Sequence, residues 1–112
     1  MSKHMQLTVI VRPYYEKDLE GTYPKLVRYL SHQDSSFADQ NPSLYELVGQ
    51  LDLLLYRFDG TPIREVLLLH KKALQDTYKQ IQDHIANRHL DQADKLLYRI
   101  EDIFDEIESE LA

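Results

Sequence analysis

The chain has 112 residues, of which 43% are hydrophobic and 29% are charged, and its formal net charge is −6. One compact domain is expected at this length and composition. Because the sequence has no cysteine, disulfides, zinc–thiolate sites and cysteine nucleophiles are excluded. The excess of acidic residues argues against nucleic-acid binding. No apolar run reaches the roughly 18–20 residues of a membrane span. The beginning of the chain lacks a signal-peptide cleavage site. We therefore predict a cytoplasmic protein with no membrane contact.

The first regular element predicted is a short β-strand over residues 6–12, "QLTVIVR". Apolar residues alternate along this β-branched run, and Pro13 ends it. No second strand is predicted, so the backbone N–H and C=O groups of this strand lack a partner within the chain. Three alternatives follow: the strand pairs with its copy in a second subunit, it pairs with a different protein, or the segment is helical.

Three helix starts are marked by a proline that follows an oxygen-bearing side chain. These starts are Thr22-Tyr23-Pro24, Asn41-Pro42 and Thr61-Pro62. Proline is favoured in the first turn of a helix, where its missing N–H has no helical partner to lose. The first two starts predict helices over residues 23–32 and 42–58.

Two long amphipathic helices are predicted over residues 62–88 and 91–111, with Asp91 as the N-cap of the second. Because the connection "NRHLD" is short, the two helices should form an antiparallel hairpin. The side chains expected at the centre of this hairpin are Leu74, Ile81, Ile85, Leu97, Ile100, Phe104 and Ile107. The predicted fold is mainly α: a small bundle of three to four helices with a long carboxy-terminal antiparallel hairpin, plus one short amino-terminal β-strand.

The last predicted helix carries all of the unbalanced charge, since residues 91–112 hold eight acidic side chains and two basic ones. Four of the acids share one face when successive residues are placed about 100° apart. These four are Asp94, Glu101, Asp105 and Glu108. Like charges at this spacing, and acids near the carboxyl end of a helix, both destabilise it. The face is either a solvated surface that keeps the protein soluble or a contact surface for a basic partner protein; we take the four acids as hypothetical partner-binding residues.

Eight tyrosines and no tryptophan are present, and four of the tyrosines lie within the first 29 residues. Tyrosine suits half-buried rims and recognition surfaces, because it combines an apolar ring with a polar hydroxyl. The alternative is that each tyrosine closes the edge of a helical core. The histidines do not follow the Glu-x-x-His pattern of metal-binding bundles. We predict no catalytic residue, no cofactor and no metal.

Arg64 followed by His70 on one helix resembles the Arg-to-His motif of HEPN-type ribonucleases. That family uses a paired Arg and His across a dimer interface to cleave RNA, so the resemblance implies a nucleic-acid-processing helical domain that uses Arg64 and His70. Glu65 stands where the family usually has a polar amide. The alternative interpretation is a solvent-facing Arg64 and a packed His70.

The predicted function is that of a small non-enzymatic protein–protein interaction module of the adaptor, chaperone, immunity or regulatory type, with a HEPN-like ribonuclease as the alternative. Self-association as a two-fold dimer is expected. The reasons are the unpaired strand and the broad apolar surface of helix 42–58, where Leu53, Leu54 and Leu55 are consecutive. The partners expected are therefore a second copy and a basic protein, without nucleic acid.

Overall fold

The computed structural model describes residues 3–5, 8–15, 18–33 and 41–111. The helices within these residues are α1 (Leu19–Thr22), α2 (Pro24–Gln33), α4 (Leu44–Gly49), α5 (Leu51–Arg57), α6 (Pro62–Ala86) and α7 (Leu90–Glu110). The prediction of a mainly helical protein is confirmed. No helix in the described part of the chain is sufficiently long and apolar to cross a bilayer.

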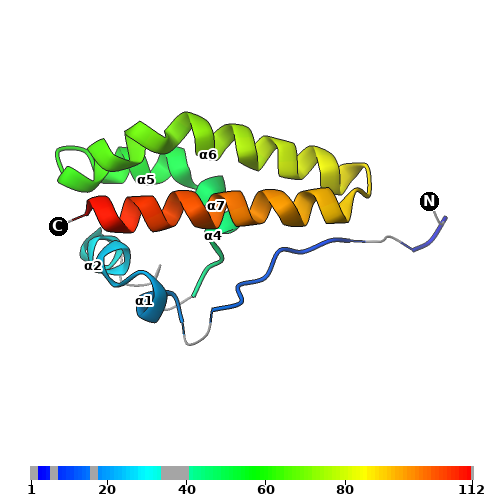
Figure 1. The fold of residues 1–112 in the computed structure, drawn as a ribbon, viewed down its shortest axis with the longest axis horizontal. Helices are drawn as coiled ribbons and strands as arrows, with labels where there is room; N and C mark the ends of the chain where they lie inside the picture. The colour runs from blue at the N-terminus through cyan, green and yellow to red at the C-terminus, as the bar shows by residue number, and fades with distance from the viewer. Residues whose placement is uncertain (1–2, 6–7, 16–17, 34–40, 112) are drawn as a thin grey trace.

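The strand predicted for residues 6–12 is not present over residues 8–12, and residues 6 and 7 lie outside the described residues. Residues 8–12 have no regular secondary structure, and Figure 1 shows them leading away from α1 as an extended segment. The β-branched composition is not sufficient for a strand, because a strand also needs a neighbouring edge. The regular structure of the remaining described residues is helical, so one copy of the chain offers no such edge.

The two longest helices, α6 and α7, lie side by side and run antiparallel (Figure 1). Helix α6 begins at Pro62 after the N-cap residue Thr61, as the sequence predicts. Helix α7 begins one residue before the predicted cap Asp91, which lies in its first turn and there complements the helix dipole. Among the residues predicted at the centre of the hairpin, the buried ones are Leu74, Ile81, Ile100, Phe104 and Ile107. Ile85 and Leu97 are half-buried.

The predicted helix 42–58 is two helices, because the chain bends at Gln50, the residue that ends α4 and begins α5. The preceding residue, Gly49, packs against α6 so closely that an added Cβ would lie 3.0 Å from the Tyr78 hydroxyl oxygen. Glycine allows this close approach, and it also weakens the helix at the same position. The bend directs most leucines of both helices into the core, whereas Leu53 stays 45% exposed.

The start of α4 is displaced from the predicted Asn41-Pro42 pair. Ser43 is the N-cap of α4, and its hydroxyl accepts a hydrogen bond from the backbone N–H of Glu46 at 3.1 Å. Asn41 instead adopts a left-handed conformation with φ of 47°, and its side-chain oxygen accepts the N–H of Leu19 at 2.9 Å. Asn41 therefore connects the beginning of α4 to the beginning of α1.

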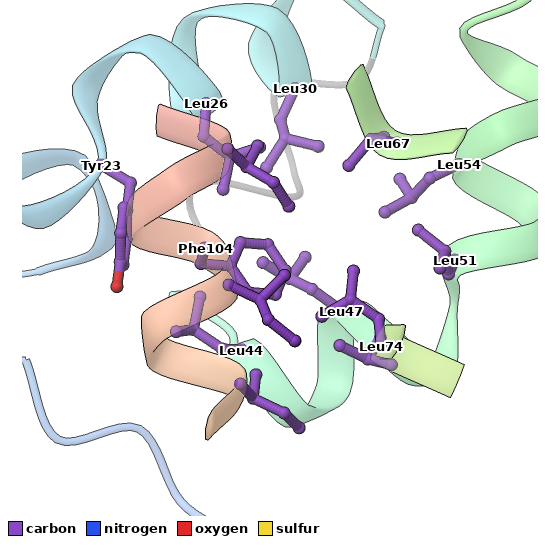
Figure 2. Packing of buried hydrophobic residues seen from close by; sticks show 14 of the residues in the cluster. Tyr23, Leu26, Leu30, Leu44, Leu47, Leu51, Leu54, Leu67, Leu74 and Phe104 are labelled. Atoms are coloured by element: carbon purple, nitrogen blue, oxygen red, sulfur yellow. The ribbon is translucent and has the colours of Figure 1, made fainter. Parts of the chain in front are cut away.

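The core forms where α2, α4 and α5 pack against the long hairpin. Figure 2 shows leucines from α2, α4, α5 and α6 converging around Phe104 of α7. Phe104 is 3% exposed, and its ring centroid lies 6.2 Å from that of Tyr23. Helices α2 and α4 contact α7, whereas α5 contacts α6, and α1 and α2 lie near the carboxyl end of α7 (Figure 1).

Candidate functional site

A cavity of about 520 Å³ lies between residues 11–15, the beginning of α4 and one face of α7. The tyrosines that line it are Tyr14, Tyr15, Tyr23, Tyr45 and Tyr98. Three of the four acids predicted as partner-binding residues line it too, namely Asp94, Glu101 and Asp105. We call this cavity the tyrosine–acid groove and define it by these eight side chains.

Three of the tyrosines form the fixed inner walls of the groove. The Tyr15 hydroxyl donates to the Pro42 carbonyl oxygen at 2.6 Å, and the Tyr23 hydroxyl donates to Asp105 Oδ1 at 2.9 Å. The Tyr45 ring stacks on that of Tyr78 with centroids 4.5 Å apart. Burial raises the pKa of Tyr15 and Tyr23 well above the usual range and that of Tyr45 to about 12. The Tyr15 and Tyr23 hydroxyls act as hydrogen-bond donors within the chain.

The other two tyrosines lie at the rim. Tyr14 is fully exposed, and Tyr98 on α7 is 61% exposed. Rings so open to solvent contribute little to the core, and they offer apolar area and a π-face to a bound molecule. The groove therefore combines a fixed inner wall with an accessible aromatic rim.

The four acids predicted to act together have different surroundings in the structure. Glu108 is half-buried, and its two carboxylate oxygens accept the backbone N–H groups of Lys25 and Leu26 at 2.8 and 3.0 Å. It thereby caps the amino end of α2. Asp105, Asp94 and Glu101 are all exposed along the groove, but Asp105 also accepts the hydrogen bond of Tyr23.

The electrostatics of the groove favour a cation. Partial burial raises the pKa of Glu101, and the neighbouring carboxylates of Asp105, Asp102 and Asp94 raise it further. A cation placed among these carboxylates would relieve their mutual repulsion. Arg12 supplies the basic side chain among the described residues that line the groove.

Arg64 and His70, the pair with the HEPN-like spacing, contact different parts of the fold. Arg64 Nε donates to the Leu55 carbonyl oxygen at 3.1 Å and thus satisfies a carbonyl near the end of α5. The His70 side chain is 15% exposed, and its Nε2 lies 3.2 Å from Glu110 Oε1 near the end of α7. Both side chains therefore have structural partners within the chain.

His70, Glu106 and Glu110 are the described residues whose grouping could hold a metal ion, because one ligand atom from each lies within 4.8 Å of the others. The sequence pattern tested above considers Glu and His on one helix, so it does not detect a group shared between α6 and α7. Both glutamates are exposed, and the pairing of His70 with Glu110 accounts for the arrangement without a metal.

The sequence identifies the acids of the groove, because helical periodicity alone places them on one face. It does not identify Tyr14, Tyr98 and Arg12 as their neighbours. The cluster of tyrosines near the beginning of the chain is a signal for recognition, but only tertiary packing brings residues 11–15 beside α7. Comparison with protein-family models, with curated proteins and with solved structures finds no match.

Proposed function

We propose that this protein is a non-enzymatic interaction module that binds a basic segment of a partner protein in the tyrosine–acid groove. The observation that carries the proposal is the presence of two exposed carboxylates, Asp94 and Glu101, in the same cavity as the exposed rings of Tyr14 and Tyr98. Carboxylates attract and orient a basic segment. Aromatic rings add contact area and cation–π attraction.

The size of the groove also fits a peptide side chain with its neighbouring backbone, since binding pockets span about 300–1,000 Å³. The proposed contact surface is narrower than the four-acid face, because Asp105 and Glu108 already accept hydrogen bonds within the chain. The class includes adaptor, chaperone, immunity and regulatory proteins. A sequence without cysteine supports the proposed cytoplasmic location.

Binding of a fluorescent lysine- and arginine-rich peptide, followed by anisotropy, tests this function. The double variant Asp94→Asn/Glu101→Gln should bind the peptide about tenfold more weakly than the parent, since each surface charge pair contributes up to about 1 kcal/mol. Affinity of the parent should fall as salt rises. The matched control is Asp76→Asn/Asp83→Asn, which removes two exposed acids from α6. An equal loss in the control, or binding that does not depend on salt, would contradict the proposal.

We also propose that the module is a two-fold dimer. Apolar side chains on the outer surfaces of the packed helices α5 and α6 remain open to solvent: Leu53, Tyr56, Leu68 and Leu69 are 45%, 81%, 41% and 77% exposed. Burial of such a surface against a second copy would be favourable. The extended residues 8–12 support the proposal too, because a second copy could supply the edge that they lack.

Light scattering at tens of micromolar protein should give the mass of a dimer, and Leu69→Gln should shift the protein toward the monomer. Leu90→Gln is the control, because Leu90 is 48% exposed at the opposite end of the hairpin. A parent protein that is monomeric at this concentration would rule out the dimer.

A further inference from the structure

The accessible part of the tyrosine–acid groove has two walls. Asp94, Tyr98 and Glu101 follow one another at spacings of four and three residues on α7, so they form one continuous stripe. Tyr14 belongs to the other wall, formed by residues 11–15 before α1. Each wall therefore presents an exposed aromatic ring, and the α7 wall adds two exposed carboxylates.

A guanidinium group satisfies both chemical features of these walls. Its planar surface stacks on aromatic rings, and its fork of N–H donors pairs with carboxylate oxygens. An ammonium group offers the same charge, but it lacks the flat surface and the fixed fork. The rim residues therefore favour arginine over lysine, and both over any neutral side chain.

The chain itself already places a guanidinium-bearing residue at this cavity, since Arg12 lines it. Arg12 is exposed and belongs to the segment without regular secondary structure, so it is not fixed by a helix. Its positive charge lines the same cavity as the acids that would bind a partner, and it therefore reduces their attraction for a second cation.

We infer that the tyrosine–acid groove is a recognition site for one arginine side chain of the partner, held by Tyr14, Tyr98, Asp94 and Glu101 in competition with the chain's own Arg12. This inference rests on the proposed function and specifies its ligand. The competition makes Arg12 a residue that weakens binding in the parent protein.

The test uses three short blocked peptides that are identical except for one central residue, which is arginine, lysine or citrulline. Citrulline keeps the shape of arginine without its charge. Titration of the full chain, followed by NMR, should give about tenfold tighter binding of the arginine peptide than of the citrulline peptide, and about threefold tighter than of the lysine peptide. Equal affinity for arginine and citrulline would overturn the inference.

Two variants then assign the residues. Tyr98→Ala should weaken binding of the arginine peptide about three- to fivefold through loss of cation–π contact. Leu90→Ala, which removes an exposed apolar side chain of α7 outside the groove, should have no effect. Tyr14→Ala should weaken binding of the arginine peptide in the same way, and because Tyr14 is fully exposed, its removal leaves the core unchanged. Arg12→Gln should tighten binding about threefold. Unchanged or weaker binding by Arg12→Gln would refute the competition.

These results separate the inference from the proposed function. If the lysine- and arginine-rich peptide binds through Asp94 and Glu101 while the arginine and lysine peptides bind equally well, the interaction module stands and arginine recognition fails. If the lysine- and arginine-rich peptide does not bind, both proposals fail.

Discussion

Replacing Phe104 with alanine is expected to lower the free energy of unfolding by about 3–5 kcal/mol, as measured by urea denaturation. Phe104 is 3% exposed and lies on α7, where leucines of α2, α4, α5 and α6 converge (Figure 2). Removing its ring leaves a cavity between helices whose backbones are fixed by their other contacts. Part of the effect comes from lost contact with the Tyr23 ring, 6.2 Å away between centroids.

Leu97→Ala is the control for this experiment. Leu97 lies two turns earlier on the same helix, but it is half-buried at the margin of the tyrosine–acid groove. We therefore expect a loss of about 1–2 kcal/mol, in proportion to the smaller apolar area that it buries. A loss below about half a kcal/mol for Phe104→Ala would mean that the ring is not at the centre of the core.

The sequence predicts the parts of this fold that depend on local periodicity. The apolar repeat locates α6 and α7, and Thr61-Pro62 marks the start of α6 because the preference for proline in the first helical turn is local. The break at Gln50 follows Gly49, whose close approach to Tyr78 joins positions far apart in the chain. A pattern of apolar residues contains no information about that contact, so it predicts one continuous helix.

The same distinction applies to the candidate site. Helical geometry is sufficient to predict that Asp94, Glu101, Asp105 and Glu108 share one face of α7. It does not predict which of them remain open to a partner, because that depends on how α2 and the extended segment pack against α7. Asp105 and Glu108 contact residues 82 or 83 positions away in the sequence. Only the folded structure separates them from Asp94 and Glu101.

Replacing Glu108 with alanine is expected to lower the free energy of unfolding by about 1–3 kcal/mol. The Glu108 carboxylate accepts the backbone N–H groups of Lys25 and Leu26, which lie in the first turn of α2. Its negative charge also complements the dipole at the amino end of α2. The Lys25 side chain also donates to the Leu111 carbonyl oxygen at 3.1 Å. Loss of the Glu108 carboxylate should therefore affect both the amino end of α2 and the carboxyl end of α7.

The matched control is Glu106→Ala, on the same turn of α7 but with an exposed side chain. Because an acid at the carboxyl end of a helix opposes its dipole, this substitution should leave stability within about half a kcal/mol or raise it slightly. Hydrogen exchange should show faster opening of the first turn of α2 in Glu108→Ala only. Equal stability of the two variants would contradict the cap.

If the cap holds, neutralising all four acids together would loosen α2 as well as remove negative charge from the groove. Docking must therefore be tested with Asp94 and Glu101 changed and Glu108 intact.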